Sequence, residues 1–249
     1  MPVKQALQVV DLLDFFAAHQ RPATLAEIAR HFGWPRSSTF NLLGTLTGRG
    51  VLYEPQGRGA YYPAPMLAAL VQRIEQAQPL PPELDALLKD LAASTGETVV
   101  VAAPAGLHAL VIAAVESPLS VRYSAAPGKQ LPLHATATGR ALLAQMDPAE
   151  RAAVLSKASF QRFTGTTLMT PALVEQEIDR SLARGWFEGR AEYSPDLGGV
   201  ALPLPLPHRP LALLVAGPVS RVGKRLDGLA REMKAQVARH LQRRTPARS

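Results

Sequence analysis

Two short helices separated by a glycine turn are predicted near the start of the chain. Apolar residues recur at helical spacing between residues 25 and 32, and Thr24 with Glu27 three positions later is typical of an N-terminal capping box. Gly33 is expected to end this helix, because glycine adopts the left-handed conformation that a tight helix exit requires. A second helix over 36–47 follows almost at once. Helices joined by so short a connection must cross steeply, which predicts a helix-turn-helix.

The second helix has two unlike faces. Pro35 suits its first position, where a missing N–H costs nothing. Phe40, Leu43 and Leu46 are expected to pack inward. The first turns also carry polar side chains that can bond phosphate oxygens and base edges in a DNA groove: Arg36, Ser37, Ser38, Thr39 and Asn41. For the Ser-Ser-Thr run alone, an alternative stays open, in which these residues only cap the helix.

A hairpin is predicted directly after this helix. Residues 51–53 and 60–62 are two short β-prone runs that flank the Gly-rich, cationic segment 56–59. The arrangement is that of the wing in a winged helix-turn-helix, and Arg58 at its tip can touch phosphate or enter a minor groove. The predicted DNA contacts are therefore Thr24, Arg36, Ser37, Ser38, Thr39, Asn41 and Arg58.

The rest of the chain predicts an α+β protein of two domains. Residues 1–63 form the winged helix-turn-helix, which opens with a helix over 4–18. Residues 64–82 hold a linker helix over 66–76 and a Pro-rich boundary, and residues 83–249 form a second domain. That domain is expected to contain a mixed, mostly antiparallel sheet flanked by helices. Its predicted strands are 98–103, 109–115, 119–125, 186–192, 199–204 and 211–216; its predicted helices are 83–94, 135–145, 148–156, 171–184 and 224–243, with loops over 127–134 and 159–170.

The predicted linker helix has an apolar stripe that needs a partner: Met66, Leu67, Leu70, Val71 and Ile74. Packing onto its own domain and contact with a second copy of the chain both remain open from the sequence.

Composition and charge narrow the class of protein. The 249 residues are 47% hydrophobic and contain no cysteine, so a sizeable core is expected and disulfide or thiolate chemistry is excluded. An apolar run of membrane-spanning length and a signal-peptide pattern are both absent, so we expect a soluble, cytoplasmic protein. The net charge of +7 is concentrated in residues 221–249, with nine Lys and Arg against two acids. DNA binding is therefore inferred from the helix-turn-helix and not from the overall charge.

Catalytic and metal-binding signatures are not found. The six histidines have no metal-ligand spacing, and common nucleophile and phosphate-binding motifs are missing. We predict no catalytic residue, metal or cofactor. The run of small polar residues from Thr136 to Gly139 could hold a ligand at a helix start. His134, directly before it, is expected more readily to fix a loop through side-chain hydrogen bonds.

Three segments resemble the IclR family of bacterial transcriptional regulators. The first is Pro35-Arg36-Ser37-Ser38-Thr39-Phe40-Asn41-Leu42-Leu43, which is similar to the family's recognition helix. The second runs Leu131-Pro132-Leu133-His134-Ala135-Thr136-Ala137-Thr138-Gly139-Arg140-Ala141-Leu142-Leu143. The third leads from Arg184-Gly185-Trp186 through Leu197-Gly198-Gly199-Val200-Ala201 to Ala216-Gly217-Pro218-Val219-Ser220.

The resemblance implies a GAF-like C-terminal domain that binds a small organic effector. It also implies homodimers, or dimers of dimers, on palindromic operator DNA. The effector pocket it implies would include His134, Thr136, Ala137, Thr138, Gly139, Gly189, Gly199, Leu214 and Ala216.

Some positions depart from the family pattern. Asn41 stands where Arg is common in the recognition helix, and Gly189 stands where binders of small acids carry an acid. Leu214 and Ala216 replace hydroxyl-bearing residues of some keto-acid binders. Since a carboxylate without polar partners is costly to bury, we expect a larger, more apolar effector than a small keto acid.

The prediction is therefore an effector-controlled transcriptional regulator of a metabolic operon, and not an enzyme. Two alternatives remain open from the sequence. In one, the second domain is an enzyme fused to a regulatory winged helix; in the other, the winged helix contacts protein instead of DNA.

Overall fold

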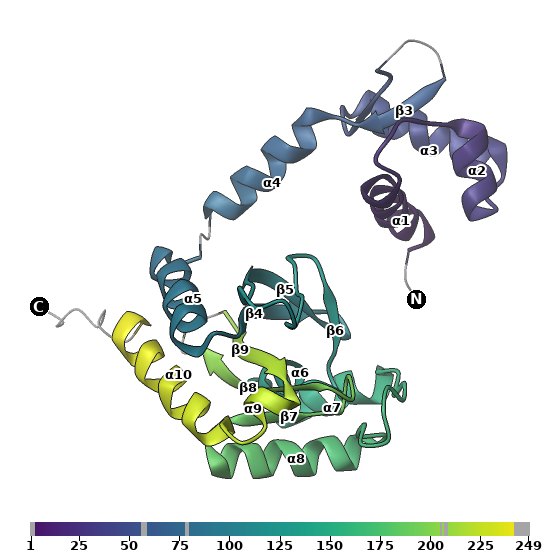
Figure 1. Cartoon of the computed structure of the whole chain (residues 1–249). Coiled ribbons are helices and arrows are strands. Elements are labelled where there is room, and N and C mark those ends of the chain that lie inside the picture. Colours follow the sequence, from purple (N-terminus) through teal and green to yellow (C-terminus); the bar gives the residue numbers. More distant parts are fainter. Residues whose placement is uncertain (1–2, 56–58, 78–79, 205, 207–208, 242–249) are drawn as a thin grey trace, which may run out of the picture. The chain divides into compact units, whose positions relative to one another are not determined.

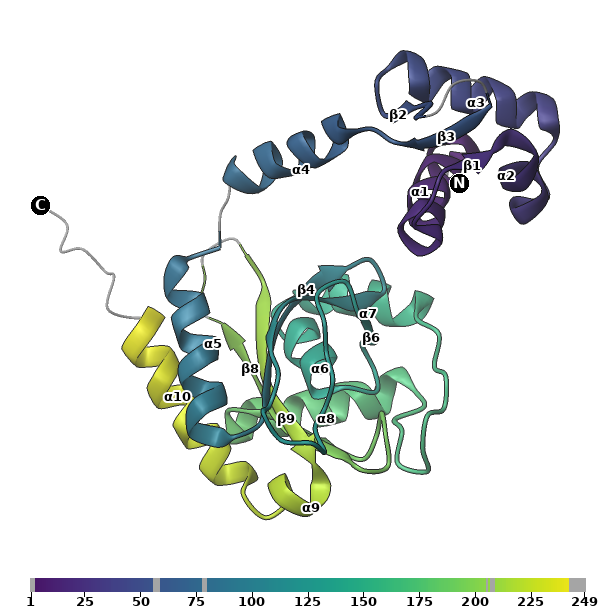
Figure 2. The ribbon, with the colours of Figure 1, turned by 45° about the horizontal axis from the view of Figure 1, so that its top comes forward.

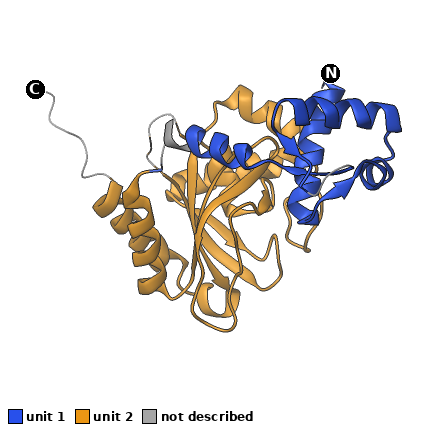
Figure 3. Cartoon of the chain, turned by 90° about the horizontal axis from the view of Figure 1, so that it is seen from above, with its two compact units in different colours: residues 1–80 blue, residues 81–249 orange. Residues whose placement is uncertain are grey.

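The computed structural model of the chain describes residues 3–55, 59–77, 80–204, 206 and 209–241. Its residues divide into two compact units, 1–80 and 81–249 (Figure 3). Each unit has its own hydrophobic core, and each is described by itself.

The first unit is a winged helix-turn-helix (Figure 1). Its strands pair antiparallel in the order β1-β3-β2. Its elements are α1 (Lys4–His19), β1 (Ala23–Thr24), α2 (Leu25–Phe32), α3 (Arg36–Gly48), β2 (Leu52–Tyr53), β3 (Ala60–Pro63) and α4 (Pro65–Ala77). The short strand β1, directly before α2, was not predicted from the sequence.

The turn between α2 and α3 is built as the sequence predicts. The Thr24 hydroxyl accepts a hydrogen bond from the Glu27 backbone N–H, and the Glu27 carboxylate accepts one from the Thr24 N–H, which completes the capping box. Gly33 closes α2 with a φ of 64°, a conformation that glycine adopts without strain. Pro35 is the residue before α3 and not its first helical residue.

The inner face of α3 differs from the prediction by one position. Leu43 and Leu46 are buried in the core of the unit beside Leu12, but the Phe40 side chain is 60% exposed. Thr39 is fully buried instead. Positions 39, 43 and 46 follow the i, i+4, i+7 spacing of one helix face, and residue 40 is rotated away from that face. The prediction that Phe40 packs inward is therefore wrong.

The second unit is a six-stranded sheet with helices on both faces (Figures 1 and 2). Its strand order is β6-β5-β4-β9-β8-β7, and every pairing is antiparallel. The strands are β4 (Thr98–Ala105), β5 (His108–Val115), β6 (Gln130–Pro132), β7 (Phe187–Arg190), β8 (Leu197–Leu204) and β9 (Leu211–Pro218). The helices are α5 (Pro82–Thr95), α6 (Ala137–Leu143), α7 (Pro148–Lys157), α8 (Pro171–Arg184), α9 (Val219–Val222) and α10 (Leu226–Leu241).

Alternation along the strands gives each face of the sheet its own core. Val100 and Ala102 of β4 point to the face that α6, α7 and α8 cover. Val99 and Val101 are equally buried and point to the opposite face, against which α5 and α10 lie side by side (Figures 1 and 2). Both faces of the sheet are therefore covered, and a ligand site must lie within a packed layer.

The predicted strand over Leu119–Ala125 does not form. This segment is irregular, and the third strand of that edge is β6, within the predicted loop 127–134. Side chains take the bonds that a strand would have given to a neighbour: the Glu116 carboxylate accepts from the Ala125 N–H, and the Thr98 hydroxyl donates to the Tyr123 carbonyl. Alternating apolar residues alone could not reveal these side-chain partners.

Candidate functional site

The N-terminal turns of α3 present an unoccupied polar surface. Arg36, Ser37, Ser38 and Asn41 are all exposed, and none of their side chains bonds to another described residue. The residue at the helix cap is Pro35, and no side chain caps the helix. The capping alternative for the serines is thus not what the structure shows. These four side chains are available to an external partner.

The other predicted DNA contacts, Thr39, Thr24 and Arg58, are not part of this exposed polar surface. Thr39 is fully buried, and its hydroxyl donates to the Pro35 carbonyl at 3.0 Å, so the prediction that Thr39 contacts DNA must be corrected. The Thr24 side chain is exposed but is engaged with Glu27 in the capping box. Arg58 lies outside the described residues.

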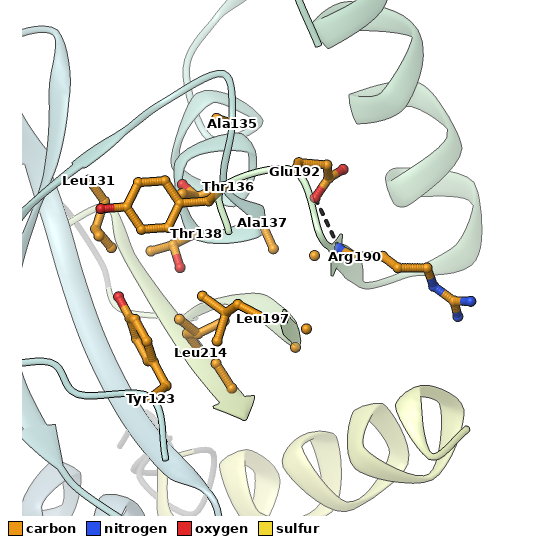
Figure 4. Close-up of a pocket in the computed structure, with 15 residues that line it drawn as sticks. Tyr123, Leu131, Ala135, Thr136, Ala137, Thr138, Arg190, Glu192, Leu197 and Leu214 are labelled. Atoms are coloured by element: carbon orange, nitrogen blue, oxygen red, sulfur yellow. Dashed lines mark hydrogen bonds between the residues drawn. The ribbon is translucent and has the colours of Figure 1, made fainter. Parts of the chain in front are cut away.

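A cavity in the second unit lies between the start of α6 and the sheet (Figure 4). Its volume is about 40 Å³. Seven of the nine predicted pocket residues line it: Thr136, Ala137, Thr138, Gly189, Gly199, Leu214 and Ala216.

Small residues form the cavity wall on the sheet and at the start of α6. A Cβ on Gly199 would lie 2.5 Å from the Val215 carbonyl oxygen, and one on Gly189 would meet the Ala137 side chain at 3.4 Å. The Thr136 hydroxyl accepts a hydrogen bond from the Gly139 N–H and caps the helix. The cavity is therefore formed by backbone and small side chains that leave its centre open.

His134 and Gly139 do not line the cavity. The His134 ring is buried, packs against Phe160, and bonds through Nε2 to the Gln161 carbonyl at 2.9 Å. Burial lowers the pKa of His134, while the hydrogen bond to Gln161 opposes this shift. A Cβ on Gly139 would overlap the Leu133 backbone. Both residues shape the helix start and the loop beside it, so their predicted direct contact with an effector is not what the structure shows.

Eight further lining residues were not among the predicted ones. They are Tyr123, Leu131, Ala135, Arg190, Glu192, Tyr193, Leu197 and Gly198. Four of them, at positions 131, 135, 197 and 198, lie inside segments that carry the family resemblance, which was a usable signal. The two tyrosines lie in irregular segments, and no sequence signal indicated that they border a ligand site.

The two tyrosines are held by hydroxyl groups of threonines. The buried Thr98 hydroxyl donates to the Tyr123 carbonyl at 2.6 Å. The Thr167 hydroxyl donates to the carbonyl of Glu192, the residue before Tyr193, at 2.7 Å. Burial raises the pKa of Tyr123 to about 12, so its hydroxyl is neutral at physiological pH and can donate a hydrogen bond.

The charged groups near the cavity are engaged elsewhere. The Glu192 carboxylate accepts from the fully buried Arg140 guanidinium at 2.9 Å, and burial raises the pKa of Glu192 although Arg140 opposes the shift. Arg140 also donates to the Glu188 carbonyl, which ties α6 to β7. The Arg190 guanidinium points away from the cavity (Figure 4) and pairs with Glu188.

One polar atom in the cavity wall has no partner. The Thr138 hydroxyl is fully buried and makes no hydrogen bond to any described residue. Buried polar atoms are nearly always hydrogen-bonded, so this hydroxyl marks a position for a polar ligand group. The described residues contain no group of acids or histidines that could hold a metal ion. No described helix is long and apolar enough to cross a membrane.

Comparison with known proteins gives a consistent result. Residues 74–243 match the family model of the bacterial transcriptional regulator IclR C-terminal domain, and residues 7–55 match the IclR helix-turn-helix domain. The chain is 26% identical over 224 residues to the transcriptional repressor IclR of Escherichia coli K12, covering 88% of this chain and 82% of the relative. It is 29% identical to the regulator BhcR of Paracoccus denitrificans, covering 79% and 70%.

Solved structures share the fold. An IclR transcriptional regulator from Alicyclobacillus acidocaldarius superposes with a TM-score of 0.74 at 24% identity, covering 96% of this chain and 98% of that one. An IclR homologue from Microbacterium hydrocarbonoxydans, solved in complex with 4-hydroxybenzoate, gives a TM-score of 0.73 at 20% identity, covering 96% and 99%.

Proposed function

The chain belongs to the IclR family of bacterial transcriptional regulators, and we propose how its two units divide that work. It is a ligand-responsive DNA-binding regulator. In our proposal, the exposed face of α3 reads operator DNA and the cavity beside α6 binds the effector. Two features of the chain carry this division. Polar side chains on α3 make no bond within the described residues, and the other unit has a cavity whose wall contains an unbonded hydroxyl.

Each exposed residue of α3 has a distinct role in the proposal. The Asn41 amide can bond N6 and N7 of an adenine in the major groove, which specifies a base. Arg36, Ser37 and Ser38 can bond phosphate oxygens, which positions the helix without reading sequence. Arg36→Ala should therefore weaken binding to all sequences alike and reduce the salt dependence of binding.

We propose that the regulator binds DNA as a homodimer. Residues 1–75 hold only seven Lys and Arg against five acids, so a single half-site contact gains little from charge. Two linked half-site contacts multiply their effect, and a two-fold protein matches a palindromic operator. Apolar side chains on α4 support this, since Met66, Leu70 and Ile74 are 44%, 42% and 64% exposed.

Sedimentation velocity tests the dimer. Ile74→Asp should shift the full chain toward monomer, whereas Gln72→Asp, an exposed α4 position outside this apolar set, serves as the charge-matched control. Dissociation by both variants alike, or by neither, would contradict the role of this surface.

We propose a mainly apolar effector from the metabolism that the regulated operon serves. The cavity has Leu131, Leu197 and Leu214 in its walls. The one acid and the one base that line it, Glu192 and Arg190, are each paired with another residue. The structural relative from Microbacterium hydrocarbonoxydans was solved with 4-hydroxybenzoate, which supports an aromatic ligand class.

Thermal-shift titration of the full chain tests the ligand class. We expect stabilisation by aromatic acids and no response to pyruvate or glyoxylate, because a ligand that binds only the folded state raises its stability. The opposite pattern would contradict the proposal. DNase I footprinting of the promoter region beside its own gene tests DNA binding independently, and a protected palindrome is expected.

A further inference from the structure

An aromatic side chain lies exposed on the helix that we propose reads DNA. Phe40 is 60% exposed, whereas the other six phenylalanines of the chain, all within the described residues, are buried or half-buried. The Phe40 ring makes no ring contact with another described residue. Single exposed apolar residues are common on protein surfaces, so exposure alone assigns no role to Phe40. Its neighbours on the helix decide what it can contact.

Phe40 shares one face of α3 with Arg36 and Gly44, because residues four positions apart lie one above the other on a helix. Arg36 is exposed and bonds to no described residue. A Cβ on Gly44 would meet no atom within 4 Å, so packing among the described residues does not require glycine there. Glycine is nonetheless one of the least favourable residues in the middle of a helix. An exposed aromatic ring is thus followed, one turn later, by bare backbone that leaves room for a partner.

The side chains around Phe40 fit nucleic acid better than a protein partner. Ser37 and Asn41 form the adjoining ridge of α3, and both are exposed with no side-chain bond to a described residue. The core of a protein interface is enriched in apolar residues and depleted in charged ones, but the exposed neighbours of Phe40 are polar, cationic or glycine. Hydroxyls, an amide and a guanidinium are the groups that bond phosphates and base edges.

A phenyl ring can recognise one feature of a base pair in the major groove. The ring has no N–H or O–H group for a phosphate or a polar base edge, but it packs against apolar surface. Among the four base pairs, the apolar group presented in the major groove is the 5-methyl of thymine, and phenylalanine is one of the residues that contact it. Because the Cα–Cβ bond of a helical residue tilts toward the N-terminus, Phe40 leans toward Arg36 and Ser37, where the proposed phosphate contacts lie.

We propose that Phe40 is a specificity-determining residue that reads the 5-methyl group of one thymine in each operator half-site, and that Gly44 lets α3 approach the DNA closely enough for this contact. The inference rests on the proposed function and adds a second kind of reading to it. Asn41 distinguishes bases by hydrogen bonds, which do not sense a methyl group, whereas Phe40 distinguishes thymine by that group alone. Loss of one buried methyl corresponds to about fourfold in affinity at one half-site, and to roughly fifteenfold when both half-sites lack it.

Uracil in place of thymine tests this contact, since the two bases differ only in the 5-methyl group. Fluorescence anisotropy of the full chain is measured with operator duplexes in which each thymine of the footprint is replaced in turn, in both half-sites, by deoxyuridine. One replacement should weaken binding roughly fifteenfold. At the same position 5-bromodeoxyuridine, whose bromine is similar in size to a methyl group, should restore the affinity.

Phe40→Ala should bind the thymine and the deoxyuridine duplexes equally well, at about the affinity of the parent for the deoxyuridine duplex. The side chain that senses the methyl group is then absent. Comparing both proteins on both duplexes also cancels any effect that the methyl group has on the DNA itself.

Variants at other positions separate this contact from general effects. Leu182→Ala removes an apolar side chain of similar exposure, 53%, from α8 in the other unit and should keep the full thymine dependence. Phe40→Leu keeps an apolar side chain and should keep part of that dependence. Gly44→Ala should raise the stability of the chain in urea unfolding, because alanine is the better helix former and the space around it is open, but should weaken operator binding several-fold. A purely structural role of Gly44 would not give these opposite signs.

Four results would overturn the assignment. Three are a footprint without any thymine whose replacement weakens binding, the same thymine dependence in Phe40→Ala as in the parent, and equal or tighter operator binding by Gly44→Ala. The fourth is dissociation of Phe40→Ala into smaller species in sedimentation velocity, which would place Phe40 against a second copy of the chain. In each of these cases a retained footprint upholds the proposed DNA reading, whereas an absent footprint would overturn that proposal and this inference with it.

Discussion

Replacing Asn41 with alanine tests its proposed contact with one base without a change in the stability of the fold. The Asn41 side chain is exposed and makes no bond to a described residue, so its removal leaves no buried group unpaired. Alanine is also the better helix former, which makes a loss of stability in α3 unexpected. Any change in DNA affinity then reports the contact with DNA.

The expected loss follows from the chemistry of the amide. A bidentate amide–adenine contact discriminates against other bases by about 1–3 kcal/mol. This corresponds to roughly 5- to 150-fold in affinity at each half-site. Because the lost term is specific to one base, binding to scrambled DNA should stay unchanged and specificity should relax at one operator position.

Thr39→Val is the matched control on the same helix. Thr39 is fully buried, and its hydroxyl bonds to the Pro35 carbonyl, so this change should alter unfolding free energy by about 1 kcal/mol and leave base preference intact. Fluorescence anisotropy with operator and scrambled duplexes, beside urea unfolding, measures both effects. Unchanged operator affinity for Asn41→Ala, or relaxed specificity for Thr39→Val, would refute this assignment of the two faces.

Three further predictions concern the second unit. Gly139→Ala should destabilise it by about 1–3 kcal/mol in urea unfolding, because the new methyl overlaps the Leu133 backbone, while Gly165→Ala, with open space around it, should be near neutral. Since burial lowers the pKa of His134 below its ordinary 6.5, the unfolded chain binds more protons below that pH. Stability should therefore fall as the pH drops below about 6.5, and His134→Gln should flatten this dependence; an unchanged slope would contradict the cause. Thr138→Val should raise the apo melting temperature by about 2–4 °C, because it removes a buried hydroxyl that has no partner among the described residues, and a lower melting temperature would count against that hydroxyl being unpaired.

The sequence predicted the helix-turn-helix well because its signals are local. A capping box, a glycine at a left-handed exit and a hairpin each depend on residues within a few positions of one another. The inner face of α3 was harder to predict. Both Thr39 and Phe40 fit a helical stripe with Leu43, and only packing against α1 and α2 decides which one enters the core.

Only the part of the ligand cavity that the start of α6 forms could be predicted from the sequence. The small residues from Thr136 to Thr138 form a continuous run, so the helix start could be recognised in the sequence. Tyr123 and Tyr193 are separated by 70 positions, and each is placed by a hydrogen bond from a distant threonine to its own segment. Contacts of that kind leave no periodic pattern.

The most direct test of the central claim couples the two units in one measurement. Operator affinity of the full chain is measured by fluorescence anisotropy across a titration with 4-hydroxybenzoate, and Ala216→Phe, which fills the cavity from β9, serves as the control. We predict that the ligand shifts operator affinity of the parent chain, and that Ala216→Phe binds operator equally well but no longer responds. An operator affinity that stays constant while calorimetry shows the ligand bound, or an undiminished response in Ala216→Phe, would contradict the account.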